Sequence, residues 1–262
     1  MDTERPASAA RGTAAYFDQW YADMVRTPER DRIMAAALGL PPEFRPASML
    51  AAGHLAEVTA ALALGPGALL ADLACGRGSY GIEVARRSGA RLAGVDFSQV
   101  ALNQARQDSA ARLPAGRARF QAGTLTATGL ADDSADAVLC VDAIQFAAPP
   151  LAGLAECRRI LRQGGVLVIT CWEAAVPGDD RVPARIGAVD LRRDLAAAGF
   201  ADVQVSDRAD WRADEQASWE RIVAAIPAGT DDPALGSLRS EGERSLAAFD
   251  SLRRVLATAA AP

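Results

Sequence analysis

Residues 69–85 read LLADLACGRGSYGIEVA, and this stretch decides the fold. Its first half predicts a buried strand over residues 68–74, and Gly76 and Gly78 predict a tight turn that leads into a helix. A strand and a helix that meet at a glycine turn form a small-molecule site at the helix N-terminus. Asp96 ends a second strand-like run, eighteen residues after Gly78, and is placed to bind the two hydroxyls of a ribose. The pattern therefore predicts a site for a nucleoside-bearing cofactor.

The composition indicates one α/β domain with a small cap. The chain has 262 residues, half of them hydrophobic, and a net charge of −5. No apolar run is long enough to span a bilayer, and the charged N-terminus lacks the apolar core of a secretory signal, so we expect a cytoplasmic protein. Four separated cysteines predict reduced thiols and no metal site. Without a basic patch, the expected partner is a small molecule rather than nucleic acid or membrane, and a homodimer is left open.

Three regions follow from the order of the elements. We expect a disordered tail over residues 1–13, an N-terminal helical cap over 14–65, and a Rossmann-like domain over 66–262 with a helical insertion at about 209–250. The predicted cap helices span 14–25, 27–38 and 48–64. The predicted strands span 68–74, 91–96, 117–122, 136–142, 166–172, 201–206 and 253–260, with helices between them. The last strand is preferred over a continuation of the helix at 233–252, and the segment before that helix is expected to be irregular. Strands that alternate with helices predict a doubly wound, mostly parallel sheet with helices on both faces.

The glycine motif alone fits two kinds of cofactor. Residues 76–81 match the dinucleotide pattern GxGxxG, so an NAD(P)-dependent oxidoreductase is one interpretation. Asp72, on the strand before the turn, discriminates between the two. Its carboxylate repels a pyrophosphate and attracts the ammonium and sulfonium of S-adenosylmethionine. At roughly 4 Å and an effective dielectric near 20, that attraction is about 4 kcal/mol before desolvation. The sign of the charge favours the cationic cofactor.

Five segments of the chain together resemble one family. Residues 72–78 (DLACGRG) and 94–98 (GVDFS) resemble motifs I and II of the class I, Rossmann-like S-adenosylmethionine-dependent methyltransferases. The resemblance continues through 120–125, 136–146 and 160–167, and covers about residues 50–208. It implies a seven-stranded sheet in the order 3-2-1-4-5-7-6 with strand seven antiparallel. It also implies S-adenosyl-L-methionine as cofactor and S-adenosyl-L-homocysteine as product.

The resemblance also implies roles for individual residues. Asp72 faces the ammonium of the cofactor, Asp96 binds the ribose, and Phe97 packs on the adenine. The other positions implied at the cofactor are Ala74, Cys75, Gly76 and Gly78 in the turn, Gly123, Thr124 and Leu125 at the adenine, and Val141, Asp142 and Gln145 beside the methionine and its methyl group.

The chain departs from the family pattern at three positions. Ala74 replaces a glycine, which is tolerable if the backbone there is extended. Thr124 replaces the acid that often contacts the adenine amino group. Gln145 stands where related small-molecule enzymes often carry a histidine, and an amide cannot act as a base.

The chemistry of an in-line methyl transfer needs alignment and exclusion of water, and a base only where the nucleophile loses a proton. Glu173, at the end of a strand, is the first candidate base; a solvated loop carboxylate is the alternative. His54, the single histidine, is the second candidate, with a structural histidine as the alternative. Gln145 completes the catalytic candidates. The aromatic residues expected at the substrate are Phe17, Trp20, Tyr21, Phe146, Trp172 and Trp211.

The sequence thus predicts a methyltransferase that acts on a small organic molecule, with a hydrophobic or aromatic specialised metabolite as the candidate acceptor. Two alternatives stay open: the oxidoreductase, and a cofactor-binding member of the fold that catalyses a reaction other than methylation.

Overall fold

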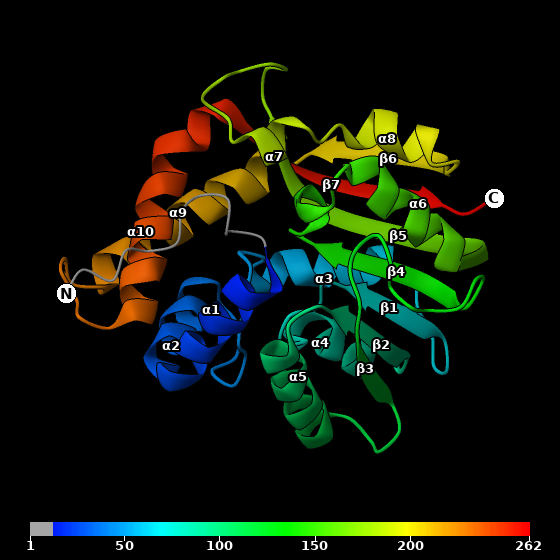
Figure 1. Cartoon of the computed structure of the whole chain (residues 1–262), viewed down its shortest axis with the longest axis horizontal. Coiled ribbons are helices and arrows are strands. Elements are labelled where there is room, and N and C mark those ends of the chain that lie inside the picture. Colours follow the sequence, from blue (N-terminus) through cyan, green and yellow to red (C-terminus); the bar gives the residue numbers. More distant parts are fainter. Residues whose placement is uncertain (1–12) are drawn as a thin grey trace.

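A single seven-stranded sheet forms the centre of the protein in a computed structural model that describes residues 13–262 (Figure 1). The predicted disordered tail, residues 1–13, lies outside the described residues except for Thr13. The strands are β1 (Leu69–Leu73), β2 (Arg91–Asp96), β3 (Ala118–Ala122), β4 (Ala135–Val141), β5 (Leu161–Ala174), β6 (Ala201–Asp207) and β7 (Leu252–Ala260). Their order is β3-β2-β1-β4-β5-β7-β6, and β7 runs antiparallel to both of its neighbours. The predicted fold class, strand order and antiparallel last strand are confirmed.

Helices cover both faces of this sheet. They are α1 (Ala14–Arg26), α2 (Pro28–Ala37), α3 (Ala52–Ala61), α4 (Ser79–Ser88), α5 (Gln99–Arg112), α6 (Pro150–Ile160), α7 (Ala184–Gly187), α8 (Leu191–Ala197), α9 (Ala209–Ala225) and α10 (Pro233–Ala248), with short 3-10 turns at Ile144–Phe146 and Phe249–Ser251. Alternate residues of β1 enter different cores: Leu70 packs with Ile82 of α4, whereas Ala71 packs with Leu154 of α6. The central strands are buried because both of their faces are covered.

The helices outside the doubly wound core gather at one end of the sheet. Figure 1 shows α1, α2, α9 and α10 on the side to which β4 points. Helix α9 packs on both α10 and α2, and α1 packs on α5. Parallel strands present their carboxyl ends to this side, so the cap covers the region in which ligands of doubly wound proteins bind.

Four predicted boundaries were wrong. The third cap helix begins at Ala52 rather than residue 48, because the Ser48 hydroxyl donates to Asp142 Oδ2 (2.7 Å) and does not cap the helix. Strand β5 is longer than predicted and includes the glycine pair at 164–165. The segment after β6 is helix α9 and not irregular chain, and the following helix ends at Ala248.

Candidate functional site

The turn after β1 brings the backbone close to any ligand at the end of the sheet. Gly76 and Gly78 have φ of +53° and +76°, a region that glycine adopts without strain, and Gly78 immediately precedes α4. Ala74 has φ of +52°, so the backbone is not extended here and the condition for tolerating an alanine without strain is not met. A left-handed alanine costs about 1–2 kcal/mol, and such strain is typical of functional sites.

Asp72 is a buried carboxylate that lacks a full set of partners. Its side chain lies against the first turn of α4, where a Cβ on Gly81 would be 2.4 Å from Oδ2. Oδ2 has no hydrogen-bond donor within the described chain. Burial, and then the nearby charge of Asp96, raise the pKa of Asp72 to about 8, although the Gly81 N–H opposes the shift. A buried oxygen without a donor fits the ammonium of the predicted cofactor, directly or through water.

Asp96 is held rigidly at the end of β2. Its Oδ2 accepts a hydrogen bond from the Gly76 N–H and its Oδ1 accepts one from the Ser98 N–H, both at 2.8 Å. Burial raises the pKa of Asp96, and these two donors oppose the shift. Each oxygen of an ionised carboxylate accepts more than one hydrogen bond, so a fixed Asp96 fits the adjacent hydroxyls of a ribose.

The segment after β3 closes on the same edge. Gly123 has no space for a side chain, because a Cβ would lie 2.7 Å from both the Thr128 carbonyl oxygen and Val95 Cγ1. The Gly123 N–H donates to the Asp96 carbonyl (3.1 Å), which fixes this segment beside β2. The Thr124 hydroxyl lies 3.3 Å from that of Thr126. Leu125 is buried in the α6-side core.

Asp142 occupies the end of β4 and is fixed by four groups. Its φ is +52°, so Asp142 is, like Ala74, a left-handed residue other than glycine that directly follows its strand. Thr170 and Ser48 donate to its two oxygens at 2.9 and 2.7 Å, and the Arg254 guanidinium contacts both oxygens. The Gln145 amide donates to the Asp142 carbonyl (2.7 Å), which leaves Gln145 Oε1 buried without a donor in the part of the chain that the structure describes.

Arg254 and Glu215 are site residues that the sequence did not indicate. Arg254, on β7, is 1% exposed, and its Nε lies 3.4 Å from Glu215 Oε2 on α9. Burial raises the pKa of Glu215 to about 8, with Arg254 opposing the shift. No motif carries either residue, and only the antiparallel return of β7 beside β5 brings Arg254 to Asp142. The ion pairs link the end of β4 to the cap.

The Glu173 side chain is held by contacts within the protein. Its Oε1 accepts a hydrogen bond from the Leu191 N–H (2.8 Å) at the start of α8, and its Oε2 pairs with Arg253. Both oxygens are thus engaged and the side chain is 3% exposed. Because this carboxylate already has donors on both oxygens, we do not retain it as the candidate base.

His54 lies between α3 and α9. Its ring stacks on Trp211 with centroids 4.4 Å apart, and Nε2 lies 3.1 Å from Asp214 Oδ2. Burial lowers the pKa of His54, with Asp214 opposing the shift. The Trp211 indole donates to Glu57 on α3 (3.2 Å). These contacts hold the cap onto the domain and account for both His54 and Trp211 without a ligand.

Helix α1 lies over the cofactor turn. The hydroxyl of Tyr21 is 2.5 Å from the place where a Cβ of Gly76 would stand, so the turn requires glycine here for contact as well as for conformation. Phe17 packs against Phe97 and Phe146 at centroid distances of 5.4 and 5.8 Å. Trp20 packs edge-on against Tyr21 (4.9 Å). The predicted aromatic face of α1 therefore meets the predicted adenine-side residue Phe97.

Trp172 lies near the end of β5 in the central sheet. It packs edge-on against Phe249, with centroids 5.1 Å apart, and the Arg254 guanidinium lies over its ring at 5.5 Å. Trp172 is therefore near Asp142, whereas Phe17 and Tyr21 are near the glycine turn. The two aromatic groups flank the carboxyl ends of β1 and β4.

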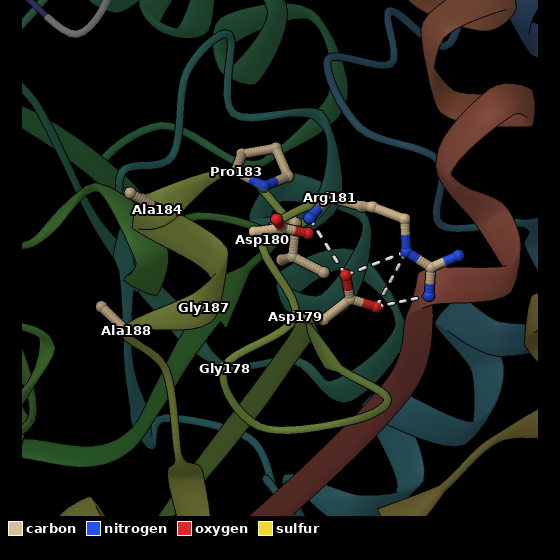
Figure 2. Close-up of a pocket in the computed structure, with 9 residues that line it drawn as sticks. Gly178, Asp179, Asp180, Arg181, Pro183, Ala184, Gly187 and Ala188 are labelled. Atoms are coloured by element: carbon tan, nitrogen blue, oxygen red, sulfur yellow. Dashed lines mark hydrogen bonds and ion pairs between the residues drawn. The ribbon is translucent and has the colours of Figure 1, made fainter.

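A concave region lies beside α7, which packs against β5 and against the 3-10 turn at Ile144–Phe146. The depression has a volume of about 720 Å³ and is lined by residues 178–184, 187 and 188, which Figure 2 shows as sticks. Arg181 closes one side through its ion pair with Asp179 (Figure 2). The lining contains none of the predicted site residues.

Residues 13–262 hold no group of three or more His, Cys, Asp or Glu side chains suited to a metal ion. None of the described helices has both the length and the apolar character needed to cross a membrane.

Comparisons with known proteins agree with this geometry. Residues 71–169 match the family model described as a methyltransferase domain. A demethylmenaquinone methyltransferase from Mycobacterium sp. (strain KMS) is 36% identical over 113 residues, which are 43% of this chain and 45% of that protein. The crystal structure of the [4+2]-cyclase SpnF superposes with a TM-score of 0.75 and 22% identity over 95% of this chain and 96% of that one. A SAM-dependent methyltransferase from Thiobacillus denitrificans was solved with S-adenosylhomocysteine. It superposes with a TM-score of 0.61 and 22% sequence identity, over 88% of this chain and 97% of that one.

The matched segment includes Asp72, the glycine turn, Asp96 and Asp142, which are the residues that the fold brings to one edge. Residues 71–169 therefore match a methyltransferase domain, and the sheet as a whole has the strand order of the class I, Rossmann-like methyltransferase fold. The sequence matches cover about half the length of the curated relatives. The structural matches, at 22% identity, show the fold alone.

Proposed function

We propose that the protein transfers the methyl group of S-adenosylmethionine to a small organic molecule bound under the cap. The observation that carries this proposal is Asp72, a buried carboxylate with an oxygen that has no donor in the described chain, next to a glycine turn. A cationic ligand compensates that charge, whereas a pyrophosphate is repelled by it. Bound cofactor supplies an activated methyl group on a positively charged sulfur.

In this proposal, the residues of the chain bind the cofactor and orient it toward the acceptor. Asp72 and the turn hold the methionine end, and Asp96 holds the ribose. Phe97 and the segment 123–125 adjoin the adenine. Asp142, fixed by Arg254, defines the edge at which the acceptor meets the methyl group, and α1 excludes water from it. The aromatic side chains of α1 and β5 favour a hydrophobic or aromatic acceptor.

The first experiment measures cofactor choice. Calorimetric titration of the purified chain is expected to show binding of S-adenosylmethionine and S-adenosylhomocysteine and none of NAD⁺ or NADP⁺. Asp96→Asn should weaken that binding at least about tenfold, because a carboxylate-to-hydroxyl hydrogen bond contributes roughly 1.5–3 kcal/mol. Asp133→Asn, in a surface loop, is the matched control. Binding of NAD⁺ alone would refute the proposal.

The second experiment tests transfer itself. Release of S-adenosylhomocysteine is measured across a panel of phenols, quinols, carboxylic acids and terpenoid alcohols. A chain that binds the cofactor but releases no product with any acceptor belongs to the alternative class, in which this fold catalyses another reaction. The structural match to a cyclase is the reason to test for a chain that binds the cofactor without transferring the methyl group.

A further inference from the structure

Two buried arginines share one carboxylate beneath the cap. Arg77, from the glycine turn, donates to both oxygens of Asp31 at 2.7 and 2.6 Å. Arg30, on α2, reaches the same carboxylate with one longer contact of 3.2 Å. Arg30 is 3% exposed and Arg77 is 1% exposed. The three side chains therefore carry one positive charge that none of them neutralises.

Arg30 has donors to spare. Its Nη1 donates to Asp31 and to the Pro46 carbonyl (3.1 Å), but Nε and Nη2 have no acceptor among residues 13–262. Burial, and then the like charge of Arg77, lower the pKa of Arg30 to about 10, so it remains a cation at neutral pH. A buried guanidinium without a close ion-pair partner of its own costs several kcal/mol, and because the Arg30 pKa remains lowered, the nearby charge of Glu241 offsets only part of that cost.

The Arg30 contacts are also redundant for the fold. Asp31 keeps its two short hydrogen bonds from Arg77 when Arg30 is removed. The Pro46 carbonyl likewise keeps a donor, because Arg77 Nη2 lies 3.4 Å away. A residue whose acceptors are already satisfied by a neighbour does little for stability, so its buried charge calls for another explanation.

An aromatic ring, a carboxylate and a tyrosine lie close to the Arg30 guanidinium. Its guanidinium carbon lies 5.5 Å from the ring centroid of Trp20 on α1. The next carboxylate that faces it is Glu241 on α10, which forms no ion pair within 4.0 Å in the described chain. Tyr21, in contact with Gly76, is close enough for Arg30 to influence its pKa. Arg30 thus lies between the cofactor turn and the aromatic face of the cap.

We propose that Arg30 binds an anionic group of the methyl acceptor, a carboxylate or a phosphate, with Trp20 packing on the acceptor's apolar part. The proposal rests on the proposed function and adds the class of acceptor to it. The planar guanidinium offers its two remaining edges for a forked contact with either anion. Entry requires α1 to move aside, because Arg30 is covered when α1 is in place.

The test compares matched probes by calorimetry on the full chain, with and without S-adenosylhomocysteine. The probes are 1-naphthoate, its neutral isostere 1-naphthamide, and 1-naphthyl phosphate. The wild-type chain should bind an anionic probe at least about tenfold more tightly than the amide. A higher affinity for the phosphate or for the carboxylate identifies which anion the site takes.

Variants separate binding from structure. Arg30→Met should abolish the preference for the anion, whereas Arg26→Met, at an arginine whose side chain is 62% exposed on α1, should retain it. Ligand-free Arg30→Met should also unfold at the same or a higher urea concentration than wild type. The proposal is overturned if wild type shows no preference for an anion, if Arg30→Met keeps the preference, or if Arg30→Met is markedly less stable.

The two proposals fail in different ways. If S-adenosylhomocysteine does not bind, the proposed function fails, and the titrations without it still decide whether Arg30 binds an anion. If S-adenosylhomocysteine binds and the anionic probes do not, the proposed function stands and the acceptor class is wrong.

Discussion

Replacing Asp72 by asparagine should make the ligand-free protein more stable and its cofactor complex weaker. Asp72 is 3% exposed, has an oxygen with no donor in the described chain, and faces the like charge of Asp96. An asparagine has the same shape and carries no charge. The substitution therefore removes the penalty of burying the carboxylate together with the attraction for a cationic ligand.

The magnitude follows from the pKa of Asp72, which is about 8 in the folded chain and roughly 4 in an unfolded one. Because the folded pKa is raised, the contribution of this group to stability is complete below about pH 4 and is lost as the pH rises to about 8. At 1.36 kcal/mol per pH unit, the loss at pH 7 is about 4 kcal/mol. Relaxation around buried charges reduces such values, so we expect a difference of about 2–4 kcal/mol.

The assay is urea unfolding followed by tryptophan fluorescence, at pH 5 and at pH 8, for wild type and Asp72→Asn. The variant should be more stable at both pH values, and its advantage should grow from pH 5 to pH 8. Calorimetry with S-adenosylmethionine should show a loss of about 10- to 100-fold in affinity for the variant, the usual range for one charge-assisted hydrogen bond. For wild type, binding at pH 7 should release a proton, visible as a dependence of the enthalpy on the buffer.

Asp132→Asn, at a loop carboxylate that is 74% exposed, serves as the control and should leave both measurements unchanged. The reasoning is refuted if Asp72→Asn is less stable than wild type at pH 8, or if its advantage does not change with pH. It is also refuted if the variant binds S-adenosylmethionine as tightly as wild type does.

Three further substitutions test neighbouring parts of the site. Ala74→Gly relieves a left-handed alanine and should stabilise the chain by about 0.5–1 kcal/mol in urea unfolding, after the extra freedom of the unfolded glycine is counted. Gly81→Ala places a methyl group 2.4 Å from Asp72 Oδ2, so the carboxylate must move; stability should fall by about 1–2 kcal/mol, and calorimetry should show weaker binding of S-adenosylhomocysteine. Arg254→Met removes the cation that pairs with half-buried Asp142 and with buried Glu215, and should cost about 3–5 kcal/mol in urea unfolding.

Local signals in the sequence were enough to predict the sheet and the cofactor edge. Asp72, the glycines after it and Asp96 lie close together along the chain, and each strand end carries its own signal in hydrophobicity and turn residues. The left-handed conformation of Ala74 could not be read from its side chain, which favours no such geometry. It depends on how the turn fits beneath the end of β2, where the Cys75 N–H donates to the Val95 carbonyl (3.0 Å).

The candidate chemistry at the acceptor side was harder to predict, because it depends on contacts between distant segments. Glu173 is at a strand end, as expected, but the N-terminus of α8 and Arg253 engage it. Arg254 reaches Asp142 only because β7 pairs with β5, 112 residues further along the chain than Asp142. The position of a carboxylate at a strand end predicts that it lies at the cofactor edge of the sheet. Contacts with residues distant in the sequence decide whether that carboxylate is free to act on a ligand.

Two buried ionisable groups on opposite sides of the cofactor turn, Asp72 and Arg30, each lack a close ion-pair partner of their own within the described chain. Asp72 lies under the turn with an oxygen that no donor in the described chain contacts, and Arg30 lies on the cap side with two idle donor positions. Arg77, the cation within the turn, is fully turned toward Asp31. Ionising Asp72 below its pKa of about 8 and burying the Arg30 cation both cost stability in the ligand-free chain, and a ligand of the opposite sign compensates each charge. A cationic cofactor and an anionic acceptor should therefore stabilise the fold separately and additively, which unfolding with each ligand alone and with both together will measure.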